Sequence, residues 1–167
     1  YRVTAIDAVG NLSTPSSVLN ATPIGPDGAS GGLFDDVDDN TYMSMQRPWQ
    51  ITNVRASNGT LSYHNAADGQ TYAPDICAAI TTIPVRVPPN GVLRYRARFN
   101  LELNWDGVVV EISTNGGTSW ADLPPTGGYP STLSQTQNPP VNACGYPATQ
   151  GAFTGSSDGA FNSYTSN

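Results

Sequence analysis

The chain has 167 residues, with 13 acidic side chains, 7 basic ones and a formal net charge of −6. Every basic residue is arginine, and the negative average field repels polyanions, so we expect no nucleic-acid partner. No stretch approaches the roughly 20 apolar residues that span a bilayer, so we expect no membrane span.

The residue composition predicts a β protein. The 17 glycines and 14 prolines, with many Ser, Thr and Asn residues, are typical of short strands joined by turns. Proline recurs too often to allow long helices, and no window carries a convincing helical stripe. We therefore expect an all-β fold, of which the antiparallel β-sandwich is the natural form.

The first segment, residues 1–19, alternates apolar and polar side chains, turns at "DAVGN" and resumes as a polar strand. An isolated hairpin is marginal in water, so this segment is expected to be part of something larger. It resembles the last two strands of a fibronectin type III domain, which implies further strands upstream. The matching residues are Tyr1, Val3, Ala5, Asp7, Gly10, Asn11, Ser13 and Ser16. Residues 20–32, rich in Pro, Gly, Ser and Thr, are typical of a linker.

A second domain is expected over residues 33–167. Its predicted strands are 49–54, 61–65, 78–87, 92–103, 107–113 and 118–123, separated by Gly, Pro or Asn turns. After Pro124, forty-odd residues show few paired apolar positions, and a structureless loop of that length is unusual in a compact domain. This tail is either a large ordered excursion held at Cys144 or it leads to strands that lie beyond the sequence.

Strict alternation along residues 92–103 predicts a half-buried strand. Leu93, Tyr95 and Ala97 begin one face, and Arg94, Arg96 and Arg98 begin the other. The arginine face is either a solvated outer surface with neighbouring acids, which is the commoner case, or a stripe that binds anions.

The acidic segment "FDDVDDN" at 34–40 is a candidate calcium site. Asp36, Asp38 and Asn40 have the spacing that opens an EF-hand loop, but Thr41 and Arg47 replace the glycine and the final glutamate, which excludes that motif. In an extended segment these oxygens share one side and could join ligands from elsewhere. The alternative is a solvated acidic entry to the domain. The candidate ligands are Asp35, Asp36 and Asp38.

The segment "STNGGTSW" at 113–120 fits the Asp-box pattern Ser-x-Asp-x-Gly-x-Thr-Trp, with Asn115 at the Asp position. Asn115 with Gly116 or Gly117 tolerates positive φ, and Trp120 is expected to pack beneath the hairpin. Sialidase-type propellers carry such a box in several blades, whereas this chain has one copy and no blade-length repeat. We therefore predict a structural hairpin turn.

The two cysteines, Cys77 and Cys144, lack CxxC spacing, and His64 is the single histidine, so no Cys/His zinc site can assemble within the chain. If the protein is secreted, the cysteines are expected to pair across a long loop. Two buried free thiols are the alternative.

No catalytic constellation stands out. The Gly-x-Ser-x-Gly matches at 28–32 and 155–159 neither follow a buried strand nor precede a helix, and such matches arise by chance in this composition. Among the aromatic residues, Trp105 in the turn "ELNWDG" is the best candidate for an exposed sugar-stacking ring, with edge packing as the alternative. Trp49 and Trp120 lie inside predicted strands and are expected in the core.

Residues 33–164 resemble a jelly-roll domain of secreted bacterial proteins. The resemblance depends on the order of "RFNLE", "WDGVVVEIST", "NGGTSW" and "LPPTGGYPSTLS". It is similar to the MAM-like or carbohydrate-binding-module-like accessory domain that accompanies metalloproteases of the immune inhibitor A type. This resemblance implies a jelly-roll β-sandwich, an extracellular location and further strands ending in an acidic pair. The resemblance assigns no catalytic protease residue to this chain.

These observations predict a non-catalytic accessory module of a large secreted or cell-surface protein, acting in spacing, stabilisation or recognition of a glycan or protein surface. Its first partners would be other domains of the same polypeptide. One alternative is part of a secreted hydrolase with its catalytic domain elsewhere. Another is a subunit of an extracellular filament or surface layer, joined by pairing of exposed edge strands.

Overall fold

The computed structural model describes residues 4, 6, 9, 11–17, 32–38, 41–67, 70–133 and 143–167. Regular structure in these residues consists of β-strands, which confirms the all-β prediction. The strands are β1 (Met43–Met45), β2 (Gln50–Thr52), β3 (Ser62–His64), β4 (Ile80–Thr82), β5 (Leu93–Ala97), β6 (Glu111–Ile112), β7 (Ala121–Asp122), β8 (Ser131–Thr132), β9 (Gly151–Ala152) and β10 (Asn162–Ser166). Across the same residues there is no helix that could cross a membrane.

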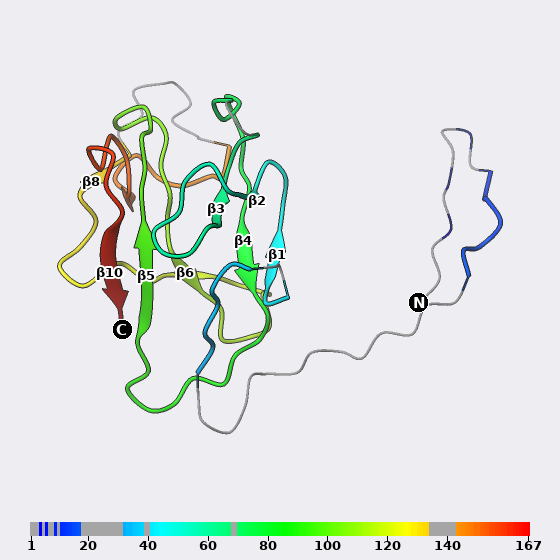
Figure 1. The fold of residues 1–167 in the computed structure, drawn as a ribbon, viewed down its shortest axis with the longest axis horizontal. Helices are drawn as coiled ribbons and strands as arrows, with labels where there is room; N and C mark the ends of the chain where they lie inside the picture. Colours follow the sequence, from blue (N-terminus) through cyan, green and yellow to red (C-terminus); the bar gives the residue numbers. More distant parts are fainter. Residues whose placement is uncertain are drawn as a thin grey trace.

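The described strands form antiparallel pairs, namely β1 with β4, β2 with β3, β5 with β10, β6 with β7 and β8 with β9. Figure 1 shows β5 and β10 on one side of the body and β1 and β4 on the other. Each strand predicted from sequence contains one observed strand, β2 to β7 in order. The observed strands are shorter, partly because Pro84 cannot donate a ladder hydrogen bond just after β4.

The tail after Pro124 was expected either to be a large ordered excursion held at Cys144 or to lead to strands beyond the sequence; its described part is ordered and paired, and Cys144 is held by a disulfide. Residues 150–166 form a continuous seam that pairs first with β8, then joins Val108 through Phe153, then Asn100 through Ser156, and finally β5 through β10. Backbone hydrogen bonds from Leu101 N to the Gly155 carbonyl (2.7 Å) and from Val108 N to the Phe153 carbonyl (3.0 Å) belong to this seam. The C-terminal segment therefore links strands that are far apart in the sequence.

Phe153, on this seam, is the centre of the core. It is only 2% exposed and is in contact with four aromatic rings, which belong to Tyr95, Phe99, Tyr129 and Tyr164. The closest ring, that of Tyr164, lies 4.7 Å away centroid to centroid in an edge-to-face arrangement, which suits the aromatic quadrupole. Because Tyr95 and Tyr164 are cross-strand partners of β5 and β10, this aromatic cluster binds that pair to the rest of the body.

Gly107 shows how closely the chains approach beside Phe153. A Cβ atom at this position would lie 2.9 Å from the side chains of both Ala152 and Leu133, which are themselves buried. Atoms of real side chains do not approach so closely, so only glycine permits the bridge between Val108 and Phe153 at this point.

In the N-terminal segment the described residues include an antiparallel bridge between Ile6 and Leu12. Both side chains are exposed, by 68% and 70%, and so is that of Val9. Most of the predicted linker 20–32 lies outside the described residues.

Candidate functional site

An open hollow of about 750 Å³ lies on the side of the body that carries β1 and β2. The chain leaves β1, turns at Gln46–Trp49, where Trp49 N donates to the Gln46 carbonyl (3.0 Å), and enters β2. The peptide bond between Arg47 and Pro48 in this turn is cis. The residues that line the hollow are Met43, Ser44, Met45, Arg47, Pro48, Trp49, Gln50, Ile51 and Ala67.

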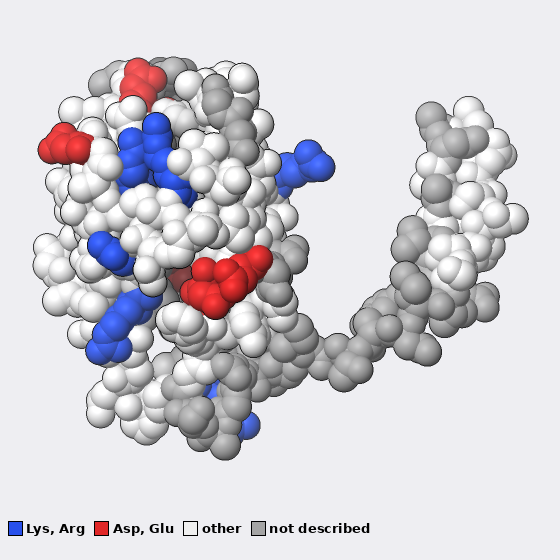
Figure 2. All heavy atoms as spheres, in the orientation of Figure 1, with Lys and Arg blue, Asp and Glu red and all other residues white. Residues whose placement is uncertain are grey.

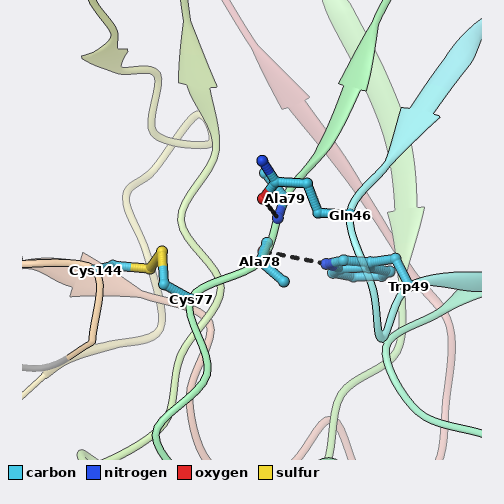
Figure 3. The surroundings of a disulfide bond; sticks show 6 residues. All are labelled: Gln46, Trp49, Cys77, Ala78, Ala79 and Cys144. Carbon is cyan, nitrogen blue, oxygen red and sulfur yellow. Dashed lines mark hydrogen bonds between the residues drawn. A yellow bond between two sulfur atoms is a disulfide. The ribbon is translucent and has the colours of Figure 1, made fainter. Parts of the chain in front are cut away.

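The turn that forms this hollow is fastened to the segment leading into β4. The indole Nε1 of Trp49 donates to the Ala78 carbonyl at 3.2 Å. Gln46 makes two bonds to Ala79: its backbone N donates to the Ala79 carbonyl (2.9 Å), and its Oε1 accepts from Ala79 N (3.0 Å). Figure 3 shows Gln46 and Trp49 reaching this segment from the same side. The orientation of the indole ring is therefore set by the neighbouring backbone.

A disulfide holds the other side of that segment. Cys77 and Cys144 are joined, with their Cα atoms 5.0 Å apart and a sequence separation of 67 residues. Figure 3 places the disulfide and Trp49 on opposite sides of residues 77–79. The hollow is thus supported by a covalent link to the start of the C-terminal segment.

The hollow combines apolar surface with polar groups. Met43, Met45 and Trp49 supply apolar or aromatic contact area, and Gln50 and Arg47 supply an amide and a guanidinium group. The Gln50 Nε2 already donates to a backbone carbonyl at 2.8 Å, which positions its Oε1 as a hydrogen-bond acceptor. Such a mixture of flat apolar surface and a few oriented polar groups is typical of small-ligand sites.

Trp105, the ring singled out from sequence, is 39% exposed. Its turn is held by Tyr72, whose hydroxyl donates to Asp106 Oδ2 (2.6 Å) and accepts from Glu102 N (3.1 Å). Asn104, with a φ of 67°, also donates its side-chain nitrogen to the Thr132 carbonyl at 2.7 Å. The Trp105 ring is therefore displayed on a firmly held turn.

The expectation that Trp120 belongs to the core is wrong. Its ring is 46% exposed, more than that of Trp105. A Cβ atom at Gly117 would lie 3.7 Å from Trp120 Cζ2, so the ring lies against the 113–120 hairpin. Trp49, also expected in the core, is half-buried and lines the hollow. The sequence pattern placed both tryptophans in strands, but it does not determine how far their side chains are buried.

The 113–120 hairpin joins β6 to β7 through a network of its own polar groups. Asn115 Oδ1 accepts from Ser119 N (3.0 Å) and Ser113 Oγ (2.9 Å), and its Nδ2 donates to Ser119 Oγ (2.8 Å). Gly116 and Gly117 have φ values of 70° and 85°, which glycine adopts without strain. These contacts leave Asn115 engaged with the turn itself.

The carboxylates of Asp35 and Asp36 in the acidic segment accept hydrogen bonds from other residues of the chain. Asp35 accepts from Val37 N (2.8 Å) and from the Tyr63 hydroxyl (2.7 Å), and Asp36 accepts from Asp38 N (3.3 Å). Asn40 lies outside the described residues. In the described ranges, no group of three His, Cys, Asp or Glu side chains comes together in a way that could hold a metal ion. Calcium at Asp35, Asp36 and Asp38 stays a prediction.

A polar cluster on β6 and β7 was not predicted. Glu111 and Asp122 are cross-strand partners, and Asp122 accepts from the Tyr129 hydroxyl (2.9 Å) and from Gln150 Nε2 (3.0 Å). Burial raises the pKa of Tyr129 well above its usual range. Burial, helped by a hydrogen bond to Glu111, raises the pKa of Tyr146 to about 12. Tyr129 and Tyr146 thus each place a phenol hydroxyl beside one of the two carboxylates.

The Gly-x-Ser-x-Gly match at 155–159 has a structural role at its central serine. Ser157 is buried, and its hydroxyl donates to the Ala160 carbonyl at 2.9 Å and accepts from Phe99 N at 3.0 Å. The hydroxyl thereby ties the C-terminal seam to the chain that follows β5. The match at 28–32 lies almost wholly outside the described residues.

No protein-family model matches the chain, and neither a curated protein nor a solved structure was found to be similar to it. Of the places described above, the hollow beside Trp49 is the one that combines concavity, an oriented aromatic ring and accessible polar groups.

Proposed function

We propose that this chain is a non-catalytic accessory module of a secreted or cell-surface protein, and that the hollow beside Trp49 binds a carbohydrate. The observation that carries the proposal is the Trp49 ring, oriented by its bond to the Ala78 carbonyl and lining an open hollow together with Arg47 and Gln50. Aromatic rings of this kind pack against the apolar face of a pyranose. Guanidinium and amide groups bind its hydroxyls.

The size of the hollow suits an oligosaccharide end or a short run of sugar units. Ligand sites in proteins commonly measure about 300–1,000 Å³, and this hollow, at about 750 Å³, lies within that range. Its openness to solvent favours a ligand that keeps one side hydrated, as a glycan chain does.

The wider setting is also a proposal. The order of segments that resembles a jelly-roll accessory domain, after a segment resembling the end of a fibronectin type III domain, supports a module within a multidomain exoprotein. The disulfide supports an oxidising compartment, where such bonds persist. Other domains of the same polypeptide would be the constant partners, and a calcium ion at the acidic segment would be structural.

Glycan-array binding tests the proposal with three variants. Trp49→Ala should abolish binding, while Trp105→Ala, which removes an exposed ring on a different turn, should leave it unchanged. Arg47→Ala changes an exposed side chain of the hollow and should weaken binding several-fold without affecting the melting temperature.

Either of two results would overturn the carbohydrate proposal: silence of the unaltered chain across a broad array, or binding that survives both Trp49→Ala and Arg47→Ala. If Trp105→Ala alone abolished binding, the site would instead be the turn at 102–106. Melting temperatures of all variants separate lost binding from lost folding.

A further inference from the structure

Three arginines form a row on the outer face of β5 and its continuation. Arg94, Arg96 and Arg98 alternate with Leu93, Tyr95 and Ala97, and Arg94 and Arg96 are exposed. We call Arg94, Arg96 and Arg98 the arginine stripe. Figure 2 shows basic side chains over β5 on this face, with acidic side chains above and beside them on the same face.

The neighbouring strand offers hydroxyl groups to the arginine stripe. In the β5–β10 register, Ser163 is opposite Arg96 and Thr165 is opposite Arg94, so these side chains share the outer face. Ser163 is exposed, and Thr165 donates its hydroxyl to Thr126 (3.2 Å). The residues directly across the pair from Arg94 and Arg96 are therefore hydroxyl-bearing.

Two of the guanidinium groups are positioned by backbone carbonyls. Arg98 Nε donates to the Gly159 carbonyl at 3.0 Å, and Arg96 Nη2 lies 3.5 Å from the Phe161 carbonyl. Each guanidinium has five N–H donors, so most donors stay available to a ligand. An arginine whose guanidinium group is already held in place loses less side-chain entropy on binding a carboxylate than a mobile arginine does.

The spacing of the stripe favours an extended ligand. Side chains two residues apart on one face of a strand are separated by about 6.6 Å, so Arg94 and Arg98 are about 13 Å apart along β5 and the residue that follows it. A single small anion would use one arginine, whereas a linear polymer with repeated anionic groups can reach all three. Once one carboxylate of the polymer is bound, the effective concentration of the next carboxylate near the following arginine is high. Several weak contacts therefore give a higher overall affinity.

The composition of this face argues for a carboxylated sugar polymer over a nucleic acid. Single-stranded nucleic acids need aromatic rings on which bases stack, but Tyr95 and Tyr164 point to the opposite face, where their rings stack on each other at 5.6 Å. The net charge of −6 opposes any polyanion at long range, an acidic polysaccharide included, so binding here depends on local contacts of the stripe. Guanidinium groups form paired hydrogen bonds with carboxylates, and the exposed Ser163 hydroxyl can form hydrogen bonds with sugar hydroxyls.

We propose that the arginine stripe binds a linear acidic polysaccharide through its carboxylate groups. This surface belongs to β5 and β10, whereas the hollow belongs to β1 and β2, so the proposal is independent of the Trp49 site. The stripe proposal can fail while the hollow still binds, and the reverse also holds.

Binding of fluorescently labelled polygalacturonate to the full chain, measured by anisotropy, tests this proposal. The double variant Arg94→Gln/Arg96→Gln should weaken binding about tenfold, since two charge-assisted contacts are lost. The matched control Arg55→Gln/Arg86→Gln removes the same charge from two exposed arginines outside the stripe and should change affinity by less than about twofold.

Binding should also fall sharply in about 1 M NaCl, where the Debye length is about 3 Å. The proposal is overturned if the unaltered chain does not bind, if neutral dextran binds equally well, or if both double variants lose the same affinity. Equal or tighter binding of single-stranded DNA, lost in the same double variant, would overturn the assignment of the ligand. Unchanged melting curves for both variants exclude loss of folding as the cause.

Discussion

Replacing Phe153 by alanine tests whether the C-terminal seam builds the core. Phe153 is 2% exposed and touches four rings, with centroid distances from 4.7 Å to 6.2 Å. Truncating a buried phenylalanine costs about 3–5 kcal/mol through lost transfer energy and the cavity left behind. We therefore expect a cost of about 4 kcal/mol, within that range.

The free energy of unfolding, from urea titration followed by circular dichroism, measures this cost. For a chain of this length, 1 kcal/mol corresponds to about 2–4 °C, so the melting temperature should fall by roughly 8–16 °C. Phe153→Leu keeps much of the volume but loses the edge-to-face contacts, and should cost about 1.5 kcal/mol.

Phe34→Ala is the matched control, because Phe34 is 82% exposed. Its removal should change the free energy of unfolding by less than about 0.5 kcal/mol. If Phe153→Ala and Phe34→Ala had equal small effects, Phe153 would not be the centre of the core, and the pairing of residues 150–166 would be refuted with it.

Two further predictions concern the cross-link and the hairpin. Replacing both cysteines by serine should lower the free energy of unfolding by about 4 kcal/mol, because a loop of 67 residues is released in the unfolded chain; an unchanged urea midpoint would contradict this. Asn115→Ala should cost about 1–2 kcal/mol through the lost turn hydrogen bonds, whereas Asn115→Asp keeps the acceptor for Ser119 N and should cost under about 0.5 kcal/mol; equal melting temperatures for the two variants would show that the side chain does not hold the turn.

Local sequence patterns correctly predicted the structure of segments whose residues have a strong conformational preference of their own. The alternation of residues 92–103 predicted β5 and its two faces, because alternate side chains of a strand point to opposite sides. The segment 113–120 predicted a turn, since Asn115, Gly116 and Gly117 favour it in any context. In both cases the information lies within a few neighbouring residues.

Patterns failed where partners distant in sequence decide the structure. Residues 150–166 are rich in Gly, Ser and Thr and show little apolar alternation, so nothing local indicates that they pair with β8 and β5. Trp120 was placed in the core because it adjoins a strand, but its side chain is 46% exposed. The cluster around Tyr129 combines residues from several segments, and only a list of spatial contacts could have found it.

The sequence by itself determined the all-β class, the approximate position of β2 to β7, the arginine row and the chemistry of the 113–120 turn. Each follows from composition or from the conformational preference of adjacent residues. The tertiary structure alone decided that Phe153 is the centre of the core, that Trp49 lines a hollow beside the disulfide, and which residues lie opposite the arginines. These depend on contacts between segments far apart in the chain, where burial and register are set by the partner and not by the local pattern.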